Sequence, residues 1–359
     1  MPQAGGLPLA PAQPPRTKVA LLLPLTGGNA QLGQQMLNAA QLALFEQGAP
    51  GFEFVPRDTG GTAAGAAEAA RGAIAGGARV LVGPLTTGET AAAAPARAAS
   101  VPMLPFTNDS NQAAPLVWPL GITPGQQMRR LVAGAHAQGA QRFALAAPSG
   151  AFGQQLAAGL RSAASDLGLP APVILNYPGA AQPALAAKDI ATRLAPPAEG
   201  TPPPPVDMLI LAEGGTRARE FAAALAGAGL TPMPKLAGSL LWASEAGLAQ
   251  EPALAGAWYP AGDPAARAQF DSRYASAFGE RPSRVAGVAY DAAALAARAV
   301  RGQPDAVPQM PVGELVLGAD GALRLGPNGQ VQRALAVFQV APGEGQVVQP
   351  ADMPGSVGY

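Results

Sequence analysis

Cysteine is absent from this chain of 359 residues, and histidine occurs once. The lack of cysteine excludes disulfides, thiolate metal sites and cysteine nucleophiles together. The single histidine, His136, lies late in an alanine-rich helical pattern and is predicted to be neither a ligand nor a base. The Gly-x-Ser-x-Gly elbow and the phosphate-binding Gly-Lys-Ser/Thr loop are also missing. We therefore predict a protein that is not an enzyme and has no catalytic residue, metal or cofactor.

Charge is scarce as well. Only 13% of the residues are charged, and 23 basic residues balance 23 acidic ones. This composition has no basic stripe of the kind that binds nucleic acid, so nucleic acid is excluded as a partner. No apolar run approaches the roughly 18 residues that a membrane-spanning helix needs.

The first sixteen residues, MPQAGGLPLAPAQPPR, lack the charged start and the long apolar core of a secretion signal. Their proline content predicts an extended linker over residues 1–16. Two interpretations stay open at this point. Either the protein is cytosolic, or an export segment lies upstream of the first residue.

Short apolar runs alternate with helical spacing along most of the chain. The runs at 19–23 and 80–82 are unbroken, which is typical of parallel strands covered on both faces. Turns rich in Gly, Pro, Thr or Asp follow the strands, and right-handed crossovers bring such turns to one sheet edge, where ligands bind. Strands are expected over 19–23, 52–55, 79–82, 101–106, 117–122, 143–147, 173–176, 208–212 and 235–237.

The helical patterns lie between these strands and after them. Residues 196–205, PPAEGTPPPP, predict an exposed polyproline-like loop. Near the end, 323–325 and 335–340 flank an Asn-Gly turn at 326–329 and predict a hairpin. Helices are expected over 29–47, 62–75, 87–99, 125–137, 152–167, 183–194, up to 226, 264–278 and 285–301.

Several motifs together resemble the type I periplasmic binding protein superfamily over roughly residues 18 to 342. They read KVALLLPLTG, RDTGG, VLVGPLTTGET, VPMLPFTNDS, PSGAFGQQL, AYDAAALAARA and DGALRLGPNGQVQRALAVFQV. The branched-chain amino-acid receptors are the nearest well-known branch. The FTNDS turn, the VWPLGITPGQQMRRLV stretch and the closing hairpin are most similar to the lipoprotein activators of penicillin-binding proteins.

The resemblance implies an α/β fold with two doubly wound open-sheet lobes, joined by a hinge of three crossings and separated by a cleft. The expected division is a linker at 1–16, lobe 1 at 17–122, lobe 2 at 123–258, a return to lobe 1 at 259–328, a lobe 2 strand at 329–345 and a loose tail at 346–359.

In the amino-acid receptors, the ligand carboxylate rests at the start of the helix after strand three. Backbone N–H groups and partial positive charge favour an anion there. The resemblance places Leu85, Thr86 and Thr87 at this point, although Thr87 has a second interpretation as the helix cap. Residues 107–109 correspond to the ammonium end, where turn chemistry is the alternative role.

The second half of the receptor pattern is broken. Gly214 stands in place of a tyrosine, Phe152 replaces another, and Leu240 aligns with the acidic partner of the ligand ammonium. Leucine cannot balance a buried ammonium, and Glu213 could do so only if its turn were remodelled. These departures argue against free α-amino acids as ligands. The candidate cleft residues are Leu85, Thr86, Thr87, Thr107, Asn108, Asp109, Phe152, Glu213, Gly214 and Ser239.

The resemblance therefore predicts a non-catalytic periplasmic protein that regulates peptidoglycan synthesis, with a penicillin-binding protein as partner. An upstream lipid anchor would attach it to the outer membrane. The alternative is the substrate-binding component of an ABC transporter for a small amino-acid-like or other polar ligand.

Overall fold

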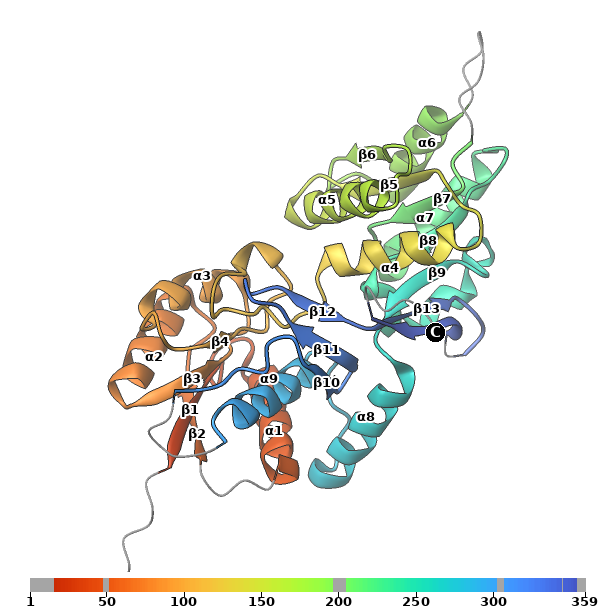
Figure 1. Ribbon diagram of the computed structural model, residues 1–359. Coiled ribbons are helices and arrows are strands. Elements are labelled where there is room, and N and C mark those ends of the chain that lie inside the picture. Colours follow the sequence, from red (N-terminus) through yellow and green to blue (C-terminus); the bar gives the residue numbers. More distant parts are fainter. Residues whose placement is uncertain (1–15, 48–51, 196–204, 302–306, 344, 354–359) are drawn as a thin grey trace, which may run out of the picture. The chain divides into compact units, whose positions relative to one another are not determined.

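The computed structural model describes residues 16–47, 52–195, 205–301, 307–343 and 345–353 (Figure 1). Its contacts divide the chain into two units. Unit 1 comprises Met1–Thr107 with Pro282–Pro311, and unit 2 comprises Asn108–Arg281 with Val312–Tyr359. The chain passes from one unit to the other three times, as the three-crossing hinge predicted. The predicted linker, apart from Arg16, and residues 196–204 of the predicted proline loop lie outside the described residues.

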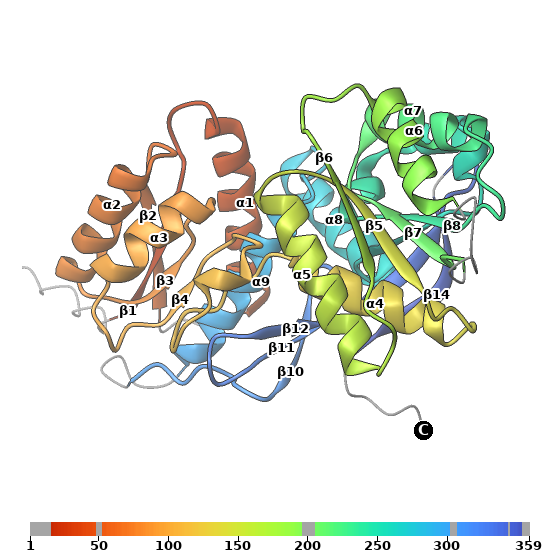
Figure 2. The same ribbon diagram turned by 90° about the horizontal axis from the view of Figure 1, so that it is seen from above.

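Unit 1 is built on a four-stranded parallel sheet with the strand order β2-β1-β3-β4. Helix α1 packs against α9, and α2 packs against α3, one pair on each face of the sheet (Figure 2). Every residue of α9 except Arg298 is buried, which its alanine-rich sequence permits. The elements are β1 (Thr17–Leu23), α1 (Ala30–Gln47), β2 (Phe52–Asp58), α2 (Ala63–Ala75), β3 (Ala78–Val82), α3 (Thr87–Ala96), β4 (Met103–Leu104) and α9 (Ala286–Ala299).

Unit 2 contains a seven-stranded sheet with the order β14-β13-β9-β8-β7-β5-β6. Its strands are parallel except at β13, which runs antiparallel to both β9 and β14. The elements are η1 (Ser110–Gln112), α4 (Pro124–His136), β5 (Phe143–Pro148), α5 (Ala151–Asp166), β6 (Val173–Tyr177), α6 (Pro183–Leu194), β7 (Met208–Leu211), α7 (Gly215–Gly227), β8 (Lys235–Gly238), η2 (Leu240–Ser244), η3 (Ala246–Gln250), η4 (Pro252–Leu254), β9 (Trp258–Ala261), α8 (Pro264–Phe278), β13 (Leu335–Gln339) and β14 (Gln346–Asp352).

Successive residues of the central strands of this sheet enter different cores. Leu209 and Leu211 of β7 join the cluster that contains buried side chains of α6 and α7. Met208 and Ile210 join the cluster that contains those of α4 and α5. This alternation follows from the two-residue period of a strand, and it explains why β7 reads as an unbroken apolar run.

A small antiparallel sheet corrects the predicted hairpin. The turn at 326–329 is confirmed, but the partner of β11 (Gly321–Leu325) is β12 (Val331–Arg333), and β10 (Leu315–Gly318) pairs on the other side. Residues 335–339 form β13 and pair with β9 in the large sheet instead. Residues 331–333 therefore pair with β11, where the prediction placed residues 335–340.

Two predicted strands fail or shrink for identifiable reasons. Residues 117–122 make only an isolated bridge, between Val117 and Ala114. The carbonyl of Leu120 accepts from Arg333 Nη2 (2.7 Å) and not from a neighbouring strand, while the Trp118 side chain donates from Nε1 to Gly326 O (2.7 Å). The strand predicted over 101–106 contracts to β4. Pro102 and Pro105 flank β4 and have no N–H for a sheet ladder.

The predicted tail is also corrected, because residues 346–352 form β14 and pair with β13. Arg130 of α4 fastens this strand. Its guanidinium donates to Leu335 O (2.6 Å), Gln349 Oε1 (2.8 Å) and Pro350 O (2.9 Å). Residues 354–359 lie outside the described part.

The division into units also differs from the predicted lobe boundaries. Residues 108–122 belong to unit 2, where Trp118 and Arg333 hold them, and the return to unit 1 covers 282–311 rather than 259–328. Helix α8 stays with unit 2 because Asp263 N donates to Asp320 O (2.8 Å) and Arg267 pairs with Asp320 (3.6 Å).

Candidate functional site

The turns after β1 and β2 are joined by Asp58 at the carboxyl edge of the unit 1 sheet. Asp58 Oδ1 accepts from Leu25 N (2.9 Å), Thr26 N (3.2 Å) and Gly60 N (2.8 Å), and Oδ2 accepts from the Thr26 hydroxyl (2.6 Å). The hydroxyl of Thr26, followed by the N–H of Gly60, holds the pKa of Asp58 below its usual value. Asp58 is therefore a structural tie between two turns.

We expect this tie to appear in the acid dependence of stability. The folded-state pKa of Asp58 is depressed, so its contribution is present above the ordinary pKa of 3.8 and is lost as the pH falls through the folded-state pKa. Asp58→Asn should lower the free energy of unfolding by about 1 kcal/mol at pH 7, because the side chain is exposed and the bonds are screened. Urea titrations at pH 7 and pH 3 should show the difference between the two proteins shrinking at the lower pH. Asp166→Asn is the control, since Asp166 lies 4.0 Å from Arg129 in an exposed pair. A difference for Asp58→Asn that does not change with pH would contradict the assignment.

Helix α3 begins with a capping box that the sequence analysis missed. Thr86, not Thr87, is the N-cap, and its hydroxyl accepts from Glu89 N (3.2 Å). Glu89 is buried at 1% exposure; its Oε2 accepts from Thr86 N (2.9 Å) and Oε1 accepts from the Thr59 hydroxyl (2.6 Å). The Thr-x-x-Glu spacing was the signal that could have identified this residue. Glu89 thus joins the turns after β2 and β3.

The start of α3 retains donors beyond this box. The Thr87 hydroxyl lies 2.7 Å from the Thr107 hydroxyl, and either can donate. Within the described ranges, the N–H groups of Leu85, Thr87 and Gly88 meet no acceptor. Thr86, Thr87 and Gly88 are exposed. The predicted residues of unit 1 are therefore brought together, and their donors suit a carboxylate oxygen.

The predicted ammonium end divides between the units. Thr107 is buried in unit 1, whereas Asn108 and Asp109 begin unit 2. Asp109 is 9% exposed; its Oδ1 accepts from Asn111 N (3.0 Å) at the start of η1 and from Gln155 Nε2 (3.1 Å) on α5. Asp109 therefore performs the turn chemistry that was one of its two predicted roles.

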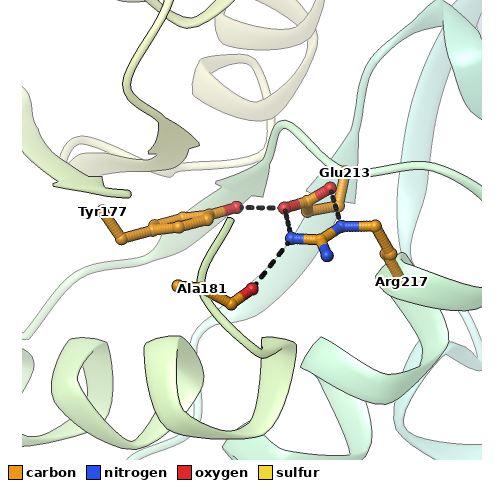
Figure 3. Close-up of polar contacts among 4 residues, drawn as sticks. All are labelled: Tyr177, Ala181, Glu213 and Arg217. Atoms are coloured by element: carbon orange, nitrogen blue, oxygen red, sulfur yellow. Dashed lines mark hydrogen bonds and ion pairs between the residues drawn. The ribbon is translucent and has the colours of Figure 1, made fainter. Parts of the chain in front are cut away.

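Glu213 follows β7 and has its charge balanced inside unit 2 (Figure 3). Its Oε1 accepts from the Tyr177 hydroxyl (2.8 Å) and Arg217 Nη2 (3.0 Å), and its Oε2 accepts from Arg217 Nε (3.0 Å). Arg217 Nη2 also donates to Ala181 O (3.3 Å). The carboxylate is buried at 7% exposure, and its three donors leave it no free charge for a ligand ammonium.

The pKa shifts around Glu213 agree with this geometry. Burial, and then the bond to Glu213, raise the pKa of Tyr177, so its hydroxyl remains a donor. The bond to Glu213 raises the pKa of Arg217. Tyr177 and Arg217 therefore keep their protons over the physiological pH range and remain donors to Glu213.

The other predicted residues of unit 2 mainly build the ends of its strands. Gly214 is the N-cap of α7 without a side-chain bond, and Phe152 packs partly against the core of α4 and α5. Ser239 is fully buried, and its hydroxyl accepts from Leu241 N (3.3 Å). Leu240 N donates to Gln127 Oε1 (2.9 Å).

Trp242 completes this edge of the sheet. It is 2% exposed, and its Nε1 donates to Glu213 O (2.7 Å). A Cβ on Gly238 would lie 2.1 Å from the indole ring, so the ring occupies the place of a side chain at 238. Trp242 is therefore a core residue of unit 2.

Two further observations concern the chemistry of the chain. In the described ranges, no group of three or more His, Cys, Asp or Glu side chains could hold a metal ion. His136 Nδ1 lies 3.1 Å from Ala140 O, a contact at the end of α4.

None of the helices in the described residues is both long enough and apolar enough to cross a lipid bilayer.

Comparison with known families identifies one match. The model of a family described as periplasmic binding proteins matches residues 16–346. No curated protein sequence matches the chain significantly.

Solved structures share the fold at low sequence identity. A protein described as a branched-chain amino acid ABC transporter from Rhodospirillum rubrum is 20% identical, with a TM-score of 0.78 over 93% of this chain and 100% of that one. A solute-binding protein of an ABC transporter from Rhodopseudomonas palustris, in complex with 3,4-dihydroxybenzoic acid, is 20% identical, with a TM-score of 0.66 over 94% and 96%. Full-length LpoA from Haemophilus influenzae is 18% identical, with a TM-score of 0.70 over 94% of this chain and 60% of that one.

Proposed function

The chain belongs to the family of periplasmic binding proteins, and from this membership we propose a non-catalytic regulator of peptidoglycan synthesis that binds a penicillin-binding protein. The observation that carries the proposal is the pairing of Glu213 with Arg217 and Tyr177. This pairing argues against a free amino acid, the ligand of the branched-chain amino-acid receptors, as the ligand of this chain.

A free amino acid needs a counter-charge for its ammonium group. Leaving that group buried and unpaired costs several kcal/mol. In unit 2, Leu240 is apolar at the aligned position, and Glu213 is already neutralised by Arg217. Glu245 is exposed beside Gly215, at the start of α7, where helix N–H groups themselves favour a carboxylate. Amino-acid transport is thus disfavoured, and a role through a protein partner is favoured.

The similarity to LpoA supports the choice of partner. Full-length LpoA shares the fold over 94% of this chain and 60% of its own length. The FTNDS and VWPLGITPGQQMRRLV segments carry the same resemblance in the sequence. We extend the proposal to a periplasmic location, with an upstream lipid anchor in the outer membrane. Mass spectrometry of the N-terminus of the native protein tests for that lipid.

The free donors at α3 favour a second candidate function, transport of a carboxylate that has no amine. Leu85, Thr87 and Gly88 offer N–H groups for the carboxylate, and such an acid has no ammonium group that needs a counter-charge. The similar Rhodopseudomonas palustris protein holds such an acid, 3,4-dihydroxybenzoic acid.

The main proposal is tested with the purified protein and the bifunctional penicillin-binding proteins of its own organism. We expect saturable binding to one of them and an increase of about threefold or more in its rate of glycan polymerisation or cross-linking. Failure to bind any of them, or binding without a change in either rate, would overturn the proposal.

Thermal shift separates the two candidates. A bound ligand stabilises by RT ln(1 + [L]/Kd), which is about 2.7 kcal/mol at one hundred times Kd. We expect no shift with leucine. An upward shift with 3,4-dihydroxybenzoate that Thr87→Ala abolishes would support transport, whereas a clear shift with leucine would contradict the role assigned to Glu213.

A further inference from the structure

A cavity of about 360 Å³ lies at the amino-terminal edge of the seven-stranded sheet in unit 2. This is the sheet edge opposite to the one that carries Glu213 and Ser239. The segments that enter β5, β6, β7 and β8 form the cavity together with the last turn of α6. Because these strands are parallel, their amino-terminal ends meet at one edge, and the cavity follows from the topology.

The walls of this cavity are mainly apolar and partly rigid. Proline has no N–H and a fixed φ, so proline walls present carbon without an unsatisfied donor. Pockets that bind small molecules span roughly 300–1,000 Å³ and combine such walls with a few polar groups. The apolar wall residues include Pro170, Ala171, Val173, Leu194, Val206 and Pro232.

Two arginines supply the charged groups of the cavity, and they differ in how their charge is balanced. Arg193 Nη1 bonds Asp189 Oδ2 (3.4 Å) and Asn176 O (3.3 Å). The backbone N–H of Arg142 donates to Asp207 Oδ2 (2.8 Å). Arg142 is a half-buried residue, and among the described residues its guanidinium, in contrast, forms no hydrogen bond or ion pair. A guanidinium in such surroundings matches a carboxylate, which can accept two parallel hydrogen bonds from it.

We propose that this cavity binds a small carboxylic acid with an apolar body, either an aromatic ring or a short aliphatic chain. The apolar body lies against the proline walls, and the carboxylate accepts from Arg142. The volume, near the lower limit for ligand pockets, restricts the ligand to a small one. This site is separate from the start of α3 and does not depend on the proposed regulatory function.

The test is a titration of the full chain with phenylacetate and hexanoate, followed by ligand-observed NMR. Phenylacetamide and hexanamide serve as uncharged controls of the same shape. Arg142→Gln removes the charge, while Val173→Trp and Ala171→Trp fill the cavity from two different positions. Arg161→Gln removes an exposed arginine of α5 that does not line the cavity, and Thr87→Ala removes the side-chain hydroxyl at the start of α3. Circular dichroism checks that each variant is folded.

We expect both acids to bind saturably and the amides to bind about tenfold more weakly or not at all. Arg142→Gln should weaken binding of the acids by about tenfold, and either tryptophan variant should abolish it. Arg161→Gln and Thr87→Ala should leave it unchanged. The proposal is overturned if neither acid binds, if the amides bind equally well, or if Arg142→Gln or both tryptophan variants have no effect. Loss of binding in Thr87→Ala would assign the ligand to α3 instead and would also overturn it.

Discussion

Replacement of Gly329 by alanine is expected to lower the free energy of unfolding by about 2–5 kcal/mol. Gly329 has φ +81°, a left-handed conformation that costs an L-residue about 1–2 kcal/mol. A Cβ there would also lie 2.3 Å from Val117 O and 2.4 Å from Ala114 O, and relieving such overpacking costs about 1–3 kcal/mol more. Urea denaturation followed by tryptophan fluorescence measures the loss.

Gly313 offers a matched control for this substitution. It has φ +82°, and nothing lies within 4 Å of the position of its Cβ. Gly313→Ala should therefore cost only the conformational part, about 1–2 kcal/mol. Equal losses in the two variants would show that the contact with residues 114–117 does not matter and would contradict the account of the turn.

The second large effect is expected at the Glu213–Arg217 pair. Arg217→Met leaves the buried carboxylate with Tyr177 as its remaining side-chain donor. Breaking a fully buried pair costs about 3–5 kcal/mol, and we expect about 2–3 kcal/mol here because the Arg217 side chain is 42% exposed. Chemical denaturation of Arg217→Met, Glu213→Gln and the double variant gives the coupling energy, which should be about 1–2 kcal/mol.

Helix α6 contains the control for this cycle. Arg193 and Asp189 form an ion pair with the same four-residue spacing, at 3.4 Å, but with side chains 41% and 59% exposed. Substituting Arg193 by Met should cost no more than about 0.5 kcal/mol. If Arg217→Met costs no more free energy of unfolding than Arg193→Met, Glu213 is not held as tightly as the geometry indicates. The argument against an amino-acid ligand then loses its basis.

Strands and helices with a clear period were predictable from sequence, whereas the choice of strand partners was not. The apolar run at 117–122 correctly indicates burial, yet its carbonyl at Leu120 binds Arg333, which is 213 residues away in the chain. No local sequence pattern predicts a hydrogen bond between residues so far apart in the chain. The hairpin failed for a related reason: 331–333 and 335–339 both continue from the turn, and only the sheet as a whole decides which one pairs with β11.

The candidate site shows the same division. The spacing of Thr86 and Glu89, and that of Glu213 and Arg217, is visible in the sequence as local pairs. The Tyr177 hydroxyl reaches Glu213 only because β6 and β7 end at the same edge of the sheet. The sequence therefore predicts the turns at the strand ends, while the hydrogen-bond partners of each polar group depend on neighbours from other strands.

The fastening of β14 by Arg130 has a consequence for self-association. A bare outer strand presents a row of unpaired N–H and C=O groups on which another polypeptide can add a strand. In the large sheet, β14 pairs with β13 and becomes the outer strand itself. On β14, Pro350 has no N–H, and its O accepts from Arg130, which also donates to Leu335 O on β13. A chain shortened to end before Gln346 would expose the backbone N–H and C=O groups of β13, and a strand of a second molecule could then pair with them.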